Sequence, residues 1–420
     1  MNFSEAETYL FSLGNEVSAM KLGLENIRAL LVALGSPQQK FLKVQVAGTN
    51  GKGSTCAFID SIVRAAGIRT GLFTSPHLVS ITERIQIDGQ KIDEANFARR
   101  STFVRDTAER LLATGGLAYR PTFFEQITAI ALLEFAERRA ELAILETGLG
   151  GRLDATTAAE AEIAVITRID LDHQEYLGNT LEAVAGEKAA IIGPNTKTAI
   201  IGPQIPEALR VIEDRINLIN TQRVEGGGSK LESVFLEHSS RYEPDQIGLK
   251  GRHQAENAAI AVGAVKALTR HFPISDENIA MGLPNARHPG RLEYQGHYLF
   301  DGAHNPGGAR ALAAYLNDLE PRPITIIFGA MEGKRVAEMA AVIFPKAEHV
   351  VLTRPENSRS AYLSDLVLAV PKEFEPSRLT LTENVGDAIN AAEDLAGPDG
   401  LILVTGSLYL VGEVKRLLNN

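Results

Sequence analysis

Residues 44–55 carry the clearest chemical signal in the chain. The apolar run 44–47 passes into a glycine-rich loop that contains Lys52, and a helical pattern follows near Ser54. In such a loop the backbone N–H groups turn toward phosphate oxygens, the lysine adds a positive charge, and the helix N-terminus adds a partial one. We therefore expect ATP to be bound by the residues of this loop, Thr49, Asn50, Gly51, Lys52, Gly53 and Ser54.

The spacing of this loop differs from that of the common P-loop. Gly48 precedes the Gly51-Lys52 pair by only two residues, and Gly53 separates Lys52 from Ser54. A glycine-rich turn without a ligand is the alternative, but a turn alone does not need the lysine. The departure narrows the class of phosphate-binding proteins to which the chain can belong.

Apolar runs alternate with helical patterns along the chain, which is typical of parallel sheets covered by helices. We expect strands at 44–47, 70–73, 142–146, 163–166, 198–201, 298–301, 324–328, 349–352 and 401–405. Helices are expected at 4–12, 24–34, 53–66, 94–113, 123–139, 180–191 and 254–270. Residues 226–229 are interpreted as a loop at the tip of a hairpin.

Length and composition bound the remaining possibilities. A chain of 420 residues is long for one hydrophobic core, and we expect two domains, 1–286 and 287–420. The net charge of −10, without clustered Lys or Arg, argues against nucleic acid as a partner. The acidic N-terminus and the lack of a long apolar run argue against a signal peptide or a membrane span. The single cysteine, Cys56, fits a reducing compartment, so we expect a cytoplasmic protein.

Three polar residues follow or lie near the predicted strands. Glu146 ends the strand 142–146, where ligand-binding residues of open α/β sheets collect, so it is a candidate Mg²⁺ ligand or else a helix cap or a partner of Arg152. His173 can be interpreted equally as a hydrogen-bonding residue or as a metal ligand. Histidine is an unusual ligand for Mg²⁺, which prefers oxygen. Lys188, on a predicted amphipathic helix, reads from the sequence alone as a solvated lysine.

Several short motifs occur in an order that narrows the family. They are Thr74–Leu78, Glu83–Ile85, Glu146–Thr156, Asp170–His173, Glu187–Ala189, His288–Arg291 and Asp301–Pro306. Together with the phosphate loop, they resemble the folylpolyglutamate synthase / dihydrofolate synthase family of the Mur ligase superfamily. The resemblance runs from about residue 20 to the end and is weakest near 195–245 and 355–400.

The resemblance implies a fold and an activity. The fold would be an α/β protein, with a P-loop-containing parallel sheet domain of the Mur ligase central-domain type and a smaller Rossmann-like α/β domain after it. The protein would be a monomeric ligase that joins L-glutamate to dihydropteroate, to a folate, or to both, through an acyl phosphate. The implied cofactor is Mg²⁺, with two ions, and ATP is the co-substrate.

The resemblance also assigns site residues. Ser75, Glu146 and His173 would hold metal, and Lys188 would be catalytic, with N6-carboxylation at the matching position of many relatives. The pterin would be bound by Thr122, Phe123, Phe124, Glu125, Leu153 and Asp154. Residues 122–125 can equally be interpreted as the capped start of a helix whose two aromatic residues lie in the core. Nucleotide contacts would come from Asn257, Arg291, Asp301 and His304, and the loop 353–359 could receive the incoming glutamate.

Three other functions stay open at this point. A folylpolyglutamate synthase without dihydrofolate synthase activity fits the same motifs. A Mur-type peptidoglycan ligase is disfavoured because too few residues precede the phosphate loop for a nucleotide-sugar domain. A nucleotide switch without catalysis is disfavoured because it has no use for the set Glu146, His173 and Lys188.

Overall fold

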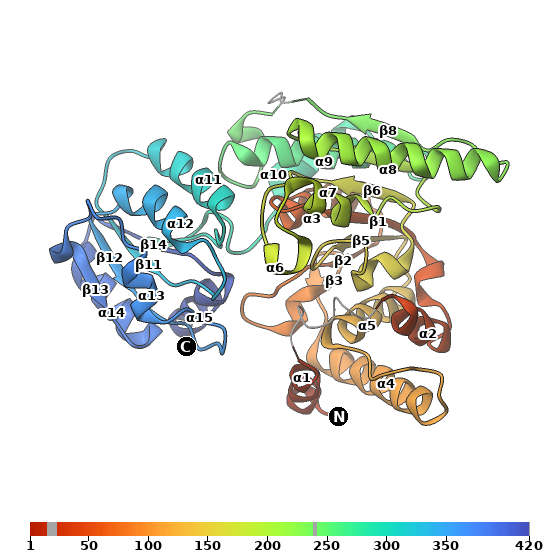
Figure 1. Cartoon of the computed structure of the whole chain (residues 1–420), viewed down its shortest axis with the longest axis horizontal. Helices are drawn as coiled ribbons and strands as arrows, with labels where there is room; N and C mark the ends of the chain where they lie inside the picture. The colour runs from red at the N-terminus through yellow and green to blue at the C-terminus, as the bar shows by residue number, and fades with distance from the viewer. Residues whose placement is uncertain (15–22, 238–241, 420) are drawn as a thin grey trace. The chain divides into compact units, whose positions relative to one another are not determined.

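The computed structural model describes residues 1–14, 23–237 and 242–419. It contains two compact units (Figure 1). Unit 1 comprises Met1–Pro76, Ile81–Gly248 and Ala255–Arg287, and unit 2 comprises His77–Ser80, Leu249–Gln254 and His288–Asn420. The division falls after Arg287, beside the boundary expected at 286, and two short segments from the first part of the chain belong to unit 2.

Unit 1 is built on a sheet with the strand order β4-β3-β2-β5-β1-β6-β7-β8 within the described residues. Its strands are β1 (Leu42–Ala47), β2 (Thr70–Phe73), β3 (Ile85–Ile87), β4 (Gln90–Lys91), β5 (Leu142–Glu146), β6 (Ile163–Ile166), β7 (Thr198–Ile201) and β8 (Glu232–Phe235). All neighbouring pairs are parallel except β2–β3 and β3–β4. Strand β1 lies at the centre, between β5 and β6.

Helices cover the sheet of unit 1 because its strands are apolar on both faces. In β5, Ala143 and Leu145 pack in one cluster with the helix α5, and α3 also packs on this strand. The helices of this unit are α1 (Phe3–Ser12), α2 (Glu25–Ala33), α3 (Lys52–Ala65), α4 (Glu94–Ala113), α5 (Phe123–Glu137), α6 (Gln174–Leu177), α7 (Leu181–Ala189), α8 (Pro206–Glu225) and α10 (Asp276–Asn285). A further helix, α9 (His253–Leu268), begins in a segment of unit 2 and continues in unit 1.

The prediction of a hairpin around residues 226–229 is wrong. These residues follow α8 and lead into β8, which pairs parallel with β7. A tight hairpin joins antiparallel strands only, so it cannot connect this pair. The buried residues Ala208, Ile212, Ile216 and Ile219 recur at helical spacing and identify α8, which the sequence interpretation missed together with α10 and the helices after residue 300.

Unit 2 is a smaller α/β unit with the strand order β13-β12-β11-β14-β10-β9. Its strands are β9 (Glu293–Gln295), β10 (Tyr298–Phe300), β11 (Ile324–Phe328), β12 (His349–Leu352), β13 (Leu379–Leu381) and β14 (Leu401–Thr405), all parallel except β9. Helices α11 (Pro306–Asn317), α12 (Val336–Ile343), α13 (Leu363–Leu368), α14 (Val385–Ala396) and α15 (Leu408–Leu418) cover it. The predicted two-part α/β fold is confirmed.

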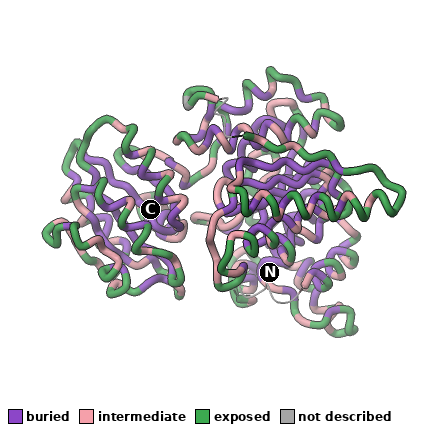
Figure 2. The backbone as a smooth tube through the Cα atoms, turned by 45° about the horizontal axis from the view of Figure 1, so that its top comes forward, coloured by how far each residue is buried: buried purple, intermediate pink, exposed green. Residues whose placement is uncertain are grey.

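Burial follows these layers. The central strands of each sheet are almost continuously buried, and exposed backbone is concentrated in helices and loops (Figure 2). In unit 2, one sheet face packs in a cluster with Phe328 and Phe344, and the other packs in a cluster with Phe300 and Val411. Within the described part of the chain, no helix is long and apolar enough to span a membrane.

Candidate active site

The phosphate loop connects the central strand β1 to helix α3. Gly51 is the N-cap of α3 and has φ +89°, a left-handed conformation that glycine adopts without strain. The Lys52 Nζ donates hydrogen bonds to the backbone carbonyls of Gly48 (3.1 Å) and Thr49 (3.3 Å). The lysine ammonium therefore lies folded over its own loop.

The segment after β6 holds this loop in place. The Thr49 backbone N–H donates to the Arg168 carbonyl (2.9 Å), and the Thr49 hydroxyl donates to the Asp170 carbonyl (2.8 Å). The hydroxyl of the buried Thr167 donates to the Asn50 carbonyl (2.8 Å). Loop 48–53 is thus fixed against the segment that leads to His173.

Asn257 of α9 lies directly against the phosphate loop. A Cβ atom built on Gly51 would stand 2.2 Å from the Asn257 Oδ1, far inside van der Waals contact. The Asn257 side chain is 7% exposed. The fold therefore brings Asn257, a predicted nucleotide-binding residue near the end of unit 1, beside the phosphate loop, which lies near the beginning of unit 1.

Glu146 and Ser75 are neighbours at the ends of adjacent strands. Glu146 is the last residue of β5 and pairs in register with Val46 of β1, just before the phosphate loop. Its Oε2 accepts a hydrogen bond from the Ser75 backbone N–H (3.1 Å), and the residue is 5% exposed. A buried carboxylate beside a serine, close to a phosphate loop, suits a divalent cation that takes its other ligands from phosphate and water.

His173 follows β6 and has a left-handed backbone with φ +50°. Its N–H donates to the Asp172 Oδ1 (2.9 Å), and its Nε2 lies 3.9 Å from the Asp172 Oδ2. Among residues 1–14, 23–237 and 242–419, no three His, Cys, Asp or Glu side chains cluster closely enough to hold a metal by themselves. The geometry brings Ser75 and Glu146 together, and the assignment of His173 to the same metal stays a prediction.

Lys188 is buried rather than solvated. It lies on α7, is 5% exposed, and its Nζ donates to the Gly48 carbonyl (2.9 Å), which also accepts from Lys52. Burial, followed by the charge of Lys52, lowers the pKa of Lys188 to about 7. The solvated interpretation is therefore wrong, and much of this amine is neutral near neutral pH.

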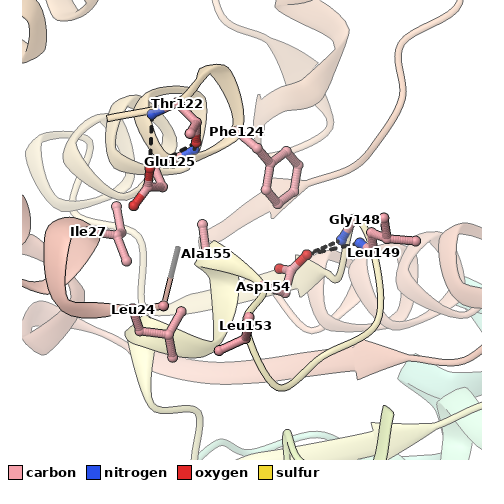
Figure 3. A pocket seen from close by; sticks show the side chains of 11 residues that line it. Leu24, Ile27, Thr122, Phe124, Glu125, Gly148, Leu149, Leu153, Asp154 and Ala155 are labelled. Carbon is pink, nitrogen blue, oxygen red and sulfur yellow. Dashed lines mark hydrogen bonds between the residues drawn. The ribbon is translucent and has the colours of Figure 1, made fainter. Parts of the chain in front are cut away.

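A pocket opens in unit 1 between α2, the start of α5 and the loop after β5 (Figure 3). It is lined by Gly23, Leu24, Ile27, Thr122, Phe124, Glu125, Gly148, Leu149, Leu153, Asp154 and Ala155. Its empty volume, part of which is open to solvent, is ≈ 400 Å³. All the predicted pterin-binding residues except Phe123 line this pocket.

The pocket wall at α5 is a capping box. The Thr122 hydroxyl accepts from the Glu125 N–H (3.3 Å), while the Glu125 Oε2 accepts from the Thr122 N–H (2.8 Å). The Glu125 Oε1 is buried and has no hydrogen-bond partner among the described residues, although the Ile27 backbone is close enough to lower the pKa slightly. Burial outweighs these contacts and raises the pKa of Glu125. The capping and the substrate-binding interpretations are compatible, because Glu125 caps the helix and also lines the pocket.

Asp154 organises the opposite wall. Its Oδ2 accepts from the backbone N–H groups of Gly148 and Leu149 (2.9 Å each), and its Oδ1 accepts from the N–H (3.0 Å) and the hydroxyl of Thr156. Burial raises the pKa of Asp154 to about 6, although all these bonds favour the charged form. The carboxylate therefore fixes the loop that closes the pocket.

Phe123 points away from the pocket lining. Its ring stacks on Phe11 with 5.8 Å between centroids and an interplanar angle of 9°, and the Arg84 guanidinium lies 5.2 Å from the same ring. The Phe124 ring lines the pocket instead, and a Cβ atom on Gly148 would stand 2.5 Å from it. Both adjacent aromatics belong to the same buried hydrophobic cluster, and only Phe124 also lines the pocket.

The predicted nucleotide residues of unit 2 surround one tight turn. Asp301 accepts hydrogen bonds from the N–H groups of Leu292 (3.1 Å) and Ala303 (3.0 Å), and Leu292 has a left-handed φ of +46°. Arg291 precedes this residue, and its charge opposes the effect of burial, which raises the pKa of Asp301. The His304 Nδ1 lies 2.8 Å from the Gly302 carbonyl. Asp301 is therefore a turn-forming residue within unit 2.

Comparisons with known proteins now bear on this site. Residues 46–265 match the model of the Mur ligase middle domain, and residues 290–408 match that of the Mur ligase, glutamate ligase domain. A dihydrofolate synthase/folylpolyglutamate synthase of Bacillus subtilis is 35% identical over 95% of this chain and 95% of its own. The chain belongs to the dihydrofolate synthase/folylpolyglutamate synthase family of Mur ligases.

Solved structures resemble this Mur ligase over its whole length. The Mycobacterium tuberculosis folylpolyglutamate synthase complexed with ADP and AMPPCP has a TM-score of 0.86 at 31% identity, and covers 100% of this chain and 98% of its own. Escherichia coli FolC in complex with DHPP and ADP has a TM-score of 0.84 at 27% identity, with the same coverage. The chain spans about half the length of two other relatives that it matches. One of them, a probable bifunctional folylpolyglutamate synthase/dihydropteroate synthase of Halobacterium salinarum, is 34% identical over 99% of this chain and 51% of its own.

Sequence reasoning missed part of the pocket of this Mur ligase. Ile27 lies in α2 and Leu24 is its N-cap, far in the sequence from the lining residues 122–155, and nothing in their local pattern indicates a ligand. Gly148 and Leu149 lie within the recognised motif 146–156 and could have been chosen from it, because Asp154 needs nearby N–H donors once it is buried. Cys56 is buried, and burial raises the pKa of its thiol, which fits a structural role.

Proposed function

We propose that this ligase joins L-glutamate to the carboxylate of a pterin-bearing substrate, and that it accepts both dihydropteroate and reduced folates that already carry glutamate. The observation that carries the proposal is the pocket of unit 1, which the ring of Phe124 and the carboxylate of Glu125 both line. A flat heteroaromatic ring can stack on the first and donate N–H groups to the second.

The chemistry follows from the weakness of a carboxylate as an electrophile. The substrate carboxylate attacks the γ-phosphorus of ATP, the bond from that phosphorus to the bridging oxygen breaks, and an acyl phosphate and ADP result. The glutamate amine then attacks the acyl carbon, inorganic phosphate leaves, and the amine loses a proton. Residues of the phosphate loop position the triphosphate, and Lys52 neutralises charge that develops during transfer.

A divalent cation fits the residues at the end of β5. Glu146 and Ser75 would hold Mg²⁺, with His173 as a further predicted ligand and two ions expected in all. When bound, the cation would neutralise phosphate charge and align the triphosphate. The support is the chemistry of the donor set, because a buried carboxylate oxygen is the kind of ligand that Mg²⁺ takes.

Lys188 is proposed to act as a carbamate. A neutral amine is the form that adds CO₂, and the lowered pKa of Lys188 makes that form available near neutral pH. The product is an anion with two oxygen acceptors, suited to a second cation beside the loop that holds Lys52. The shared contact of both lysines with the Gly48 carbonyl supports a role at the phosphate site.

Residues of unit 2 complete the proposal. We assign Arg291, Asp301 and His304 to the nucleotide, with Asp301 acting through the turn that it holds, and the loop 353–359 to the incoming glutamate. In that loop the Arg354 guanidinium lies 4.7 Å from the Tyr362 ring, and its Nε is buried with no partner among the described residues. The monomeric state, the absence of a nucleic-acid partner and the cytoplasmic location stay predictions from the sequence.

Phosphate release measured with separate substrates tests the function. The full chain is incubated with ATP, Mg²⁺ and either dihydropteroate or tetrahydrofolate, each with and without L-glutamate. Glutamate-dependent release with both substrates supports the bifunctional proposal. Glutamate-dependent release with tetrahydrofolate but not with dihydropteroate means that the ligase is a folylpolyglutamate synthase only. The absence of release with both substrates contradicts the proposed function.

A further inference from the structure

Gln45 is a buried amide at the centre of the sheet of unit 1. It lies in β1 between the apolar residues Val44 and Val46, and it is 1% exposed. Burying an unbonded amide costs about 1–3 kcal/mol in proteins, so a glutamine at this position must be hydrogen-bonded to be tolerated. Its partners therefore show what it does there.

Three threonine hydroxyls surround the amide nitrogen of Gln45. The Nε2 lies 2.8 Å from the Thr157 Oγ1, 2.9 Å from the Thr156 Oγ1 and 3.3 Å from the Thr147 Oγ1. An amide nitrogen carries two hydrogens, so the two shorter contacts use both of them. All three threonines lie in the segment between β5 and β6 that closes the pocket.

The amide nitrogen imposes a direction on these hydrogen bonds. Because it can only donate, the Thr156 and Thr157 oxygens accept from it, and their own hydroxyl hydrogens point onward. The Thr156 hydroxyl then donates to the Asp154 carboxylate, and the Thr157 hydroxyl donates to the Gly151 carbonyl (2.7 Å). One amide thus orients two hydroxyls toward two different points of the loop.

Both chains of hydrogen bonds end at functional parts of the site. Asp154 holds the Gly148 and Leu149 N–H groups in the pocket wall. Gly151 packs against α7, because a Cβ atom there would stand 2.7 Å from the Glu187 carbonyl, next to Lys188. The loop 147–157 is therefore anchored by Gln45, a residue that does not line the pocket.

We infer that Gln45 is a positioning residue for the pocket: from β1 its amide orients the hydroxyls of Thr156 and Thr157, and this keeps the loop 147–157 in the conformation that binds the pterin-bearing substrate. The inference rests on the proposed function in one respect, the identity of that substrate. Gln45 does not line the pocket itself. The inference predicts that the loss of its amide weakens substrate binding and leaves ATP binding unchanged.

The main variant is Gln45→Met, which keeps the length of the side chain and removes its donors. Thr156 and Thr157 keep their onward acceptors, so their hydroxyls stay hydrogen-bonded, and we expect the fold to be retained. We expect the KM for dihydropteroate to rise about tenfold, the loss that corresponds to one or two hydrogen bonds, with the KM for ATP unchanged within about twofold. The rise of this KM on acidification should begin at a higher pH than in the parent, because the Thr156 hydroxyl, without the Gln45 donor, is held less firmly toward the Asp154 carboxylate.

A second pair of variants keeps the test decisive if Gln45→Met fails to fold. Thr157→Val removes one hydroxyl of the chain and should raise the dihydropteroate KM, whereas Thr157→Ser keeps the hydroxyl and should resemble the parent. Thr198→Val, the same change at a buried position of β7, is the matched control and should leave both KM values unchanged. Any of three results would overturn the inference. The two KM values could change equally, the dihydropteroate KM could stay unchanged in a folded Gln45→Met variant, or Thr157→Val and Thr157→Ser could behave identically.

Calorimetric titration with dihydropteroate separates this inference from the proposed function. If the parent binds dihydropteroate and Gln45→Met binds it more weakly, the positioning role holds even when no glutamate is ligated. A parent that ligates glutamate to dihydropteroate, with variants of unchanged affinity, leaves the function intact and removes the role of Gln45.

Discussion

At the scale of single residues, the site depends on two lysines that converge on one backbone carbonyl. Lys52 and Lys188 both donate to Gly48, and neither belongs to the hydrophobic core. Two ammonium groups so close repel each other unless an anion lies between them or one of them loses its charge. The proposed triphosphate and the proposed carbamate would each supply such an anion, so the two lysines are expected to have different tasks.

Lys52→Ala should abolish phosphoryl transfer and preserve the fold. The lysine contributes charge rather than packing, and the loss of one such stabilising group slows transfer by about 10²–10³-fold. ATP-dependent phosphate release at saturating ATP measures the effect, and circular dichroism measures the fold. Lys91→Ala, at an exposed position of β4, is the control. Near-normal turnover in a folded Lys52→Ala variant would remove the loop from the phosphate site.

Lys188 should tolerate neither alanine nor arginine. Alanine removes the anion that the carbamate supplies, and a guanidinium keeps a positive charge and cannot be deprotonated to take up CO₂. We expect both variants to be inactive and a short-chain carboxylic acid to restore part of the turnover of Lys188→Ala. Steady-state rates with and without the acid provide the measurement. A fully active Lys188→Arg variant would show that an ordinary cation suffices.

Substrate binding should weaken as the pH falls through about 6. Asp154 has its pKa raised to about 6, so its carboxylate becomes protonated below that pH and loses its capacity to accept four hydrogen bonds from the pocket loop. If only the ionised form holds the loop, the KM for dihydropteroate should be about tenfold higher at about pH 5 than at about pH 7, because roughly a tenth of the carboxyl is then ionised. The KM for ATP, measured in parallel, should change much less.

Asp154→Asn tests this assignment. The amide cannot accept all the bonds of the carboxylate and does not titrate, so the dihydropteroate KM should be high at every pH and lack the step near 6. Glu125, whose pKa is also raised, remains in this variant. A pH profile that is unchanged in Asp154→Asn would assign the step to another group.

At the scale of elements, helix α3 has a glycine at each end with a different purpose. Gly51 at its N-terminus and Gly67 after its C-terminus have φ of +89° and +75°. A Cβ atom at Gly51 would collide with the Asn257 Oδ1, whereas a Cβ atom at Gly67 would meet nothing within 4 Å. The left-handed backbone explains Gly67 fully, and Gly51 is also required for the close approach of α9.

Gly51→Ala and Gly67→Ala should therefore behave differently. Each introduces left-handed strain of about 1–2 kcal/mol in the free energy of unfolding. Only Gly51→Ala should also raise the KM for ATP, because the new methyl displaces Asn257 from the loop. Urea unfolding and ATP kinetics measure the two effects. Equal ATP kinetics in the two variants would mean that the contact with Asn257 has no part in nucleotide binding.

At the scale of the whole molecule, an acidic chain is proposed to bind polyanions. The net charge is −10, and the positive charge proposed for the phosphate site is that of Lys52, which lies over its own loop in unit 1. Local geometry therefore outweighs the overall charge at short range, since exposed charges beyond about 10 Å are screened at physiological salt.

Nucleotide binding should stabilise the full chain. A ligand that binds only the folded state adds about 2.7 kcal/mol to the free energy of unfolding at a concentration of 100 times its Kd. We expect ADP with Mg²⁺ to raise the midpoint of thermal unfolding in a concentration-dependent way, and to have little effect on Lys52→Ala. An identical rise in that variant would place the nucleotide elsewhere.

Elements and motifs could be predicted from the sequence because their signals are local. β1, the loop 48–53 and α3 follow from an apolar run, glycine spacing and helical periodicity within one stretch of residues. The order of motifs along the chain was enough to indicate the family. The missed helix α8 also has a periodic signal, so its omission was an error of interpretation rather than a limit of the sequence.

Only the tertiary structure decided which polar side chains are buried and what they contact. Lys188 meets the Gly48 carbonyl across 140 positions of sequence, and Gln45 meets Thr156 across 111. A solvated lysine and a buried one have the same local pattern, and no local pattern distinguishes Phe124, which lines the pocket, from Phe123, which does not. Burial and hydrogen bonding depend on residues brought together by the fold, so the sequence identified the chemistry of this protein and the packing determined which residues are placed to perform it.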